Sequence, residues 1–174
     1  MPQINIKENR GVTLIEIIIT IGLIFILTVT AIINYNRLTE DNALYDASRF
    51  VIFLSQQTQE DAKHGKDDKP HGFIINDTVL DQNQIVVFAD GSYYAADRAY
   101  DENYYIPDRL KFVYARFYDT PGVYFDEVAF SKGKGVPNYA NGEIRIEPKN
   151  EASHSYVILT MNSEGRWTID EGYE

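Results

Sequence analysis

The chain has no cysteine among its 174 residues. Disulfide bridges, thiolate catalysis and zinc–thiolate sites are therefore excluded, and an apolar core must hold the fold by itself. The three histidines are His64, His71 and His154, and none has a second ligand at a spacing typical of metal sites. We expect solvated loop positions for all three, with no metal ion and no other cofactor.

Motifs for catalysis and for nucleic-acid binding are missing as well. The sequence contains no G-x-S-x-G turn, no G-K-[ST] phosphate loop and no nucleophile with a local base. We therefore expect no catalytic residue and no enzyme activity. Positive charge is also scarce, because 16 Lys and Arg residues face 26 Asp and Glu residues and give a net charge of -10. Such a balance disfavours direct contact with nucleic acid, which requires cations that neutralise phosphates.

Charge is absent altogether from residues 17–33. As a helix with a rise of about 1.5 Å per residue, this run would be about 26 Å long. The hydrocarbon core of a bilayer is roughly 30 Å thick, and the apolar residues of segment 12–15 extend the run towards that length. The sequence therefore predicts a membrane-spanning helix.

One acid, Glu16, interrupts the start of this apolar segment. An unpaired acid in a bilayer costs about 2.5 to 3.5 kcal/mol, so we expect a partner for Glu16; hydration close to the membrane surface is the alternative. Lys7 and Arg10 precede the segment and favour a cytoplasmic position for the first residues. A secretory signal peptide would end in a cleavage site of small residues, but residues 34–42 read NYNRLTEDN.

Residues 11–16, GVTLIE, closely resemble the class III signal of type IV pilins and pseudopilins. In that signal a glycine precedes a hydrophobic residue, and an acid is the fifth residue after the cleaved bond. The resemblance implies that a prepilin peptidase cleaves between Gly11 and Val12 and methylates the new amino terminus of Val12. It also implies that the apolar helix is kept and becomes the core of a filament. Because the new amine of Val12 is a cation near a medium of low dielectric constant, we expect Glu16 of a neighbouring subunit to be its counter-ion. Val12 replaces the commoner phenylalanine, and the helix lacks the proline of many pilins.

The chain is accordingly predicted to have three parts: a cleaved leader (1–11), a transmembrane and filament-core helix (12–36) and an exported globular domain (37–174). Within the domain, residues 37–62 lack glycine and proline and continue the helix. Their apolar residues recur at spacings of three and four and form one stripe, which comprises Leu44, Ala47, Val51, Leu54 and Thr58. We expect Phe50 and Phe53 to flank this stripe and to widen the buried face.

Short runs of β-branched and aromatic residues follow and predict an antiparallel sheet over residues 72–170. The expected strands are 72–76, 84–89, 110–118, 126–131, 142–147, 155–162 and 165–169, with the last two forming a hairpin. Residues 90–109 are expected to be irregular. The fold class is therefore α+β, with a long N-terminal helix packed on an antiparallel sheet. The order of these elements is similar to that of minor pseudopilins of the GspH/FimT type.

Tyrosines crowd the segment 90–109, namely Tyr93, Tyr94, Tyr100, Tyr104 and Tyr105. Tyrosine is enriched at protein interfaces, so these residues suggest a surface for neighbouring subunits or an outside ligand. The alternative interpretation is that they cover the edge and the core of the sheet.

The same segment contains an acidic loop over residues 90–102, with Asp90, Asp97, Asp101 and Glu102. Calcium binding through these oxygen ligands is one hypothesis, but the loop lacks EF-hand spacing and a solvated loop is preferred. Residues 76–78 (Asn-Asp-Thr) fit a glycosylation acceptor, a triplet that is common by chance.

We therefore expect a structural subunit of a bacterial type IV pilus-like or type II secretion filament, either a minor pilin or a pseudopilin. The expected partners are prepilin peptidase, other pilin subunits and an inner-membrane assembly platform. The expected location is the inner membrane, with the domain outside the cytoplasm and the filament outside the cell. Two alternatives stay open, the major pilin of the fibre and a membrane-anchored adhesin delivered to a filament tip.

Overall fold

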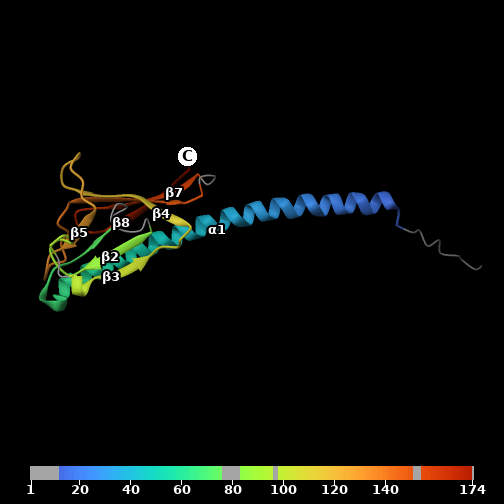
Figure 1. Cartoon of the computed structure of the whole chain (residues 1–174). Helices are drawn as coiled ribbons and strands as arrows, with labels where there is room; N and C mark the ends of the chain where they lie inside the picture. Colours follow the sequence, from blue (N-terminus) through green and yellow to red (C-terminus); the bar gives the residue numbers. More distant parts are fainter. Residues whose placement is uncertain (1–11, 76–82, 96–97, 151–153, 174) are drawn as a thin grey trace, which may run out of the picture. The chain divides into compact units, whose positions relative to one another are not determined.

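The computed structural model describes residues 12–75, 83–95, 98–150 and 154–173 (Figure 1). Several residues discussed above lie outside these ranges: Lys7, Arg10, Gly11, the triplet 76–78 and Asp97. The described chain divides into two compact units between Thr39 and Glu40. The first unit is helical, and the second contains the end of the helix and all the strands.

Helix α1 extends over Leu14–His64, close to the predicted limits of 12 and 62. It ends at Gly65, whose φ of 65° is left-handed and whose amide donates to the carbonyl of Ala62 over 3.1 Å. A short 3₁₀ turn, η1 (Lys66–Asp68), then reverses the chain towards the first strand.

The first sheet has the strand order β3-β2-β1-β5, and all its pairs are antiparallel. Its strands are β1 (His71–Ile74), β2 (Gln84–Phe88), β3 (Glu102–Tyr105) and β5 (Glu127–Phe130). A second 3₁₀ turn, η2 (Arg98–Tyr100), precedes β3. Strand β3 lies inside the segment 90–109 that was predicted to be irregular. The prediction missed it because β3 is a mostly exposed edge strand of sequence ENYY, without alternating apolar residues.

The second sheet has the order β4-β6-β7-β8 and is also antiparallel. Its strands are β4 (Leu110–Tyr118), β6 (Asn141–Pro148), β7 (Ser155–Met161) and β8 (Trp167–Tyr173). The predicted hairpin of the last two strands is confirmed, although β8 continues to Tyr173, where it pairs with Ser155. The α+β class is confirmed, but the strands form two sheets and not the single sheet expected. The chain leaves the first sheet for β4 and returns for β5, an exchange that local sequence patterns do not reveal.

One apolar core joins the end of α1 to both sheets. The predicted stripe is confirmed, because its five residues are all buried, and Phe50 packs at its edge. Phe53 contradicts the prediction, since 58% of it is exposed. Residues three positions apart on a helix differ by 300° of rotation, which is the same as 60° in the opposite direction. Phe53 is therefore turned 60° further from the core than Phe50 is. Strand β6 alternates as expected, with Ile144 and Ile146 fully buried.

The first sheet is covered on both faces. Phe73, Ile85 and Val128 contact the main core, whereas their neighbours along the strands form a second cluster with Tyr93. The members of this second cluster are Ile74, Val86, Phe88, Ala129 and Tyr93. Burial on two faces explains the continuous apolar runs of β1, β2 and β5, because a strand with one solvated face alternates.

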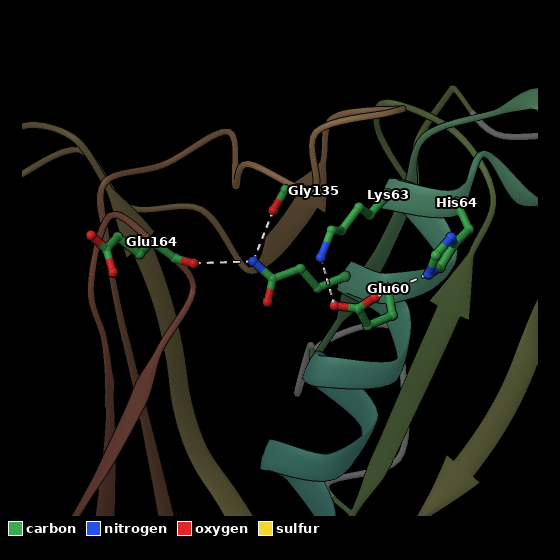
Figure 2. Close-up of polar contacts among 6 residues, drawn as sticks. Glu60, Lys63, His64, Gly135 and Glu164 are labelled. Carbon is green, nitrogen blue, oxygen red and sulfur yellow. Dashed lines mark hydrogen bonds and ion pairs between the residues drawn. The ribbon is translucent and has the colours of Figure 1, made fainter.

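Polar contacts fasten the end of α1 to the loops of the second unit. The side-chain amide of Gln59 donates to the carbonyl oxygens of Gly135, over 2.8 Å, and Glu164, over 3.0 Å (Figure 2). Both approaches require glycine: Gly135 and Gly165 have φ values of 65° and 77°, and a Cβ at either would lie within 3.1 Å of an atom of Gln59. These contacts join two distant loops to one helical turn.

Candidate functional site

The start of α1 is capped by a reciprocal pair of hydrogen bonds between Thr13 and Glu16. The Glu16 amide donates to Thr13 Oγ1 over 3.3 Å, and the Thr13 amide donates to Glu16 Oε2 over 2.9 Å. The Thr13 hydroxyl also donates to Glu16 Oε2, over 3.0 Å. This arrangement is a capping box, which satisfies two amides at the start of a helix. Both bonds to the carboxylate end on the same oxygen, Oε2.

The capping box reduces the cost of an acid in an apolar segment without removing it. A cap stabilises a helix by about 0.5 to 2 kcal/mol, and an acid in the first turn adds about 0.3 to 1 kcal/mol through the helix dipole. Placing the acid in a bilayer costs about 2.5 to 3.5 kcal/mol. The contacts of Glu16 within its own chain therefore offset only part of that cost.

Sequence reasoning singled out Glu16 and missed Thr13. The signal that identifies Thr13 is the pattern T-x-x-E directly before an apolar run, which is typical of a capping box. Val12 lies immediately before the cap and is 73% exposed. Gly11, which is expected to precede the cleaved bond, lies outside the described residues.

The apolar half of α1 presents its side chains outward. The large hydrophobic residues from Leu14 to Ile33 are exposed, and an 18-residue window of the helix has a mean hydropathy of 2.6. Among the described residues, α1 is the one helix long and apolar enough to cross a membrane, by length and composition. The hydroxyls of Thr20 and Thr28 donate to the carbonyls of Glu16 and Ile24, over 2.7 and 2.8 Å, so these polar groups are satisfied inside the helix.

The tyrosine-rich segment separates into buried and exposed members. Tyr93 is buried against Phe88, and Tyr104 packs beside Phe50 with ring centroids 6.1 Å apart. Buried Glu127 holds the loop before Tyr93, accepting the Tyr93 amide over 2.6 Å and the Ser92 hydroxyl over 2.7 Å. The other three tyrosines, Tyr94, Tyr100 and Tyr105, are exposed. Part of the segment therefore covers the core, and part forms surface.

The acidic loop and the histidines form no metal centre among the described residues, which contain no group of three or more potential ligands. Asp90 accepts the amide of Gly91 over 2.6 Å and is half-buried. His64 and His154 are exposed, as expected. His71 contradicts the expectation of a solvated loop, because it is buried at the start of β1 with its Nε2 2.9 Å from the carbonyl oxygen of Lys66. The reversal at η1 brings that carbonyl back to the histidine.

Comparisons with known proteins support the fold. No protein-family model matches the chain, and no curated protein sequence matches it. Among solved structures, the type IV minor pilin FimU of Pseudomonas aeruginosa matches with a TM-score of 0.50 and 14% identity, covering 76% of this chain and 92% of FimU. A second crystal form of FimU gives a TM-score of 0.46 and 13% identity, covering 73% and 92%. The resemblance expected from residues 11–16 is thus confirmed at the level of the fold: one long N-terminal helix packed on antiparallel strands.

Proposed function

We propose that this chain is a minor pilin or pseudopilin, a structural subunit of a type IV pilus-like or type II secretion filament. The observation that carries the proposal is the capped acid at the start of an exposed apolar helix, in a chain whose fold is similar to that of a type IV minor pilin. The helix anchors the subunit in the membrane before assembly and bundles with other helices in the filament. The globular domain lies outside the cytoplasm.

Processing comes first in this proposal. Prepilin peptidase cleaves the bond between Gly11 and Val12 and methylates the amine of Val12, which then carries the positive charge of the new terminus. In the assembled filament, Glu16 of one subunit pairs with this amine on its neighbour. The capping box uses Oε2, so Oε1 is the oxygen that we assign to the neighbour's amine.

The pair would set the axial position of one subunit against the next. Removing one partner of a buried ion pair costs about 3 to 5 kcal/mol, enough to disfavour other registers by factors of a hundred or more. Thr13 acts as a positioning residue for Glu16. Thr13→Ser keeps the hydroxyl and should assemble normally, whereas Thr13→Val removes the hydroxyl and should reduce assembly less than Glu16→Ala does.

The test is the intact mass of the chain extracted from membranes of cells with and without prepilin peptidase. We expect loss of residues 1–11 and gain of one methyl group, both dependent on the peptidase and abolished by Gly11→Ala. Glu16→Ala should be cleaved but absent from sheared filaments. A full-length chain, or one cleaved elsewhere, would refute the processing step. The abundance of the chain in filaments separates a minor subunit from a major pilin.

A further inference from the structure

A cavity of about 230 Å³ lies between the last turns of α1, the η1 turn, the end of β2 and residues 99–104. Leu54, Val87 and Phe88 give it apolar walls. Its charged lining is strongly acidic: among the described residues, four carboxylates face one lysine, and they are Asp61, Asp67, Asp101 and Glu102 against Lys66. The rings of Tyr100 and Tyr104 also line the cavity, and so do the polar side chains of Gln57, Thr58 and His71.

Cations of the chain itself already occupy two parts of this lining. Lys66 Nζ donates to Asp61 Oδ2 over 3.0 Å. This hydrogen bond raises the pKa of Lys66, and the charges of Asp61, Glu102 and Asp67 raise it further. Lys69 Nζ lies 4.7 Å from the centroid of the Tyr100 ring, within the range of a cation–π interaction. The lining therefore stabilises ammonium groups at two separate places.

The opposite wall is held in position by its own contacts. The Tyr104 hydroxyl donates to Glu102 Oε2 over 2.5 Å, which orients the carboxylate. The Tyr104 ring in turn packs edge-on against Phe50. A carboxylate that the fold already orients loses less conformational freedom when a ligand binds.

We propose that this cavity binds an aliphatic ammonium group, with the carboxylates of Asp61, Asp101 and Glu102 as counter-ions and the ring of Tyr100 as a cation–π wall. The volume is below the roughly 300 to 1,000 Å³ of sites for drug-sized ligands, so it suits one side chain or a short diamine. An anion is disfavoured by the excess of carboxylates. The site is independent of the filament assembly proposed above, which uses the other end of α1.

Two kinds of ligand contain an aliphatic ammonium group of this size: a lysine side chain of a partner protein and a free diamine. The test uses the full chain in detergent micelles at fixed ionic strength, with nuclear magnetic resonance shifts of the Tyr100 and Glu102 amides as the signal. The probes are Nα-acetyl-lysine methylamide, 1,5-diaminopentane and the uncharged Nα-acetyl-norleucine methylamide. We expect saturable shifts with a cationic probe and none with norleucine. Binding of the lysine probe alone identifies a side-chain ligand, and tighter binding of the diamine identifies a free amine.

Three variants test the proposal, because each is expected to change the affinity for the cationic probe in a different way. Glu102→Gln should weaken binding roughly tenfold, the loss expected for a hydrogen bond between charged groups. Lys66→Met should strengthen binding, because it removes the one of the chain's two competing cations that is bound to a carboxylate of the lining. Asp170→Asn on β8 makes the same charge change as Glu102→Gln away from the cavity and should leave binding unchanged. Equal weakening by Glu102→Gln and Asp170→Asn, weaker binding in Lys66→Met, or equal binding of norleucine would overturn the proposal.

Discussion

We predict that removing the side-chain amide of Gln59 lowers the stability of the globular unit, because this amide joins the end of α1 to two loops. Its amide nitrogen donates to two backbone carbonyls, one in the β5–β6 loop and one in the β7–β8 turn (Figure 2). Gln59→Leu keeps the size of the side chain and its preference for a helix, but it removes both hydrogen bonds. Any loss of stability in this variant can therefore be assigned to the two missing hydrogen bonds.

The expected loss of stability follows from where the two acceptors lie. Gly135 is buried, so its carbonyl would lose its donor without gaining water, at a cost of about 1 to 3 kcal/mol. Glu164 is exposed, and its carbonyl would be hydrated again, so its contribution is about 0.5 to 1 kcal/mol. The two losses together come to about 1.5 to 4 kcal/mol. At about 4 °C per kcal/mol for a unit of this size, Tm should fall by roughly 6 to 16 °C.

The assay is thermal unfolding of the full chain in detergent micelles, followed by the fluorescence of Trp167, the one tryptophan in the sequence. Trp167 Nε1 donates to Ser55 Oγ over 2.8 Å, so its signal reports the contact between α1 and β8. Gln56→Leu is the matched control, because Gln56 is exposed on the same helix and should tolerate the change within about 0.5 kcal/mol. Equal stability of the two variants would refute this account of Gln59.

Three further predictions concern the core and pH. Gly72→Ala should cost about 1 to 3 kcal/mol in chemical unfolding, because the new Cβ would lie 2.5 Å from Phe88 Cζ and from the Val128 carbonyl oxygen, whereas Gly91→Ala meets nothing within 4 Å and should be nearly neutral. Leu54→Ala should cost about 2 to 5 kcal/mol, but exposed Phe53→Ala should change stability by less than about 0.5 kcal/mol; similar losses would place Phe53 in the core after all. Burial, followed by the hydrogen bond to Glu143, raises the pKa of Tyr114 to about 12. Its contribution to stability is therefore complete below pH 10 and is lost as pH rises from 10 to 12, so Tyr114→Phe should flatten the measured pH dependence in that range.

The sequence by itself determined the long helix and most of the strands. A run of apolar residues without charge must either be buried or face a lipid-like environment, and the stripe from Leu44 to Thr58 requires a core on one side. These are local periodicities, and they are visible without knowledge of what packs against them. The strand pattern of β4, with the predicted limits 110–118, and the buried isoleucines of β6 followed from the same kind of signal.

The candidate site at the start of α1 was also readable from local sequence. Glu16 stood out because an acid is costly in an apolar run, and the T-x-x-E pattern of Thr13 lies within one helical turn. Its capping geometry needed only the helix itself. The cleaved bond and the pairing with a neighbour stay predictions, because they depend on a peptidase and on other subunits.

Only the tertiary structure decided how the strands divide and what covers them. The return of the chain to β5 after β4 made two sheets, and strand β3 formed because a neighbouring edge accepted a polar segment. The exposure of Phe53 and the burial of His71 depended on which elements lie opposite them. The acidic cavity likewise collects residues from α1, η1, β2 and the segment 99–104, which are up to 50 positions apart in the sequence. Periodicity records which face of an element is buried, whereas the identity of the neighbour across that face depends on contacts between distant segments.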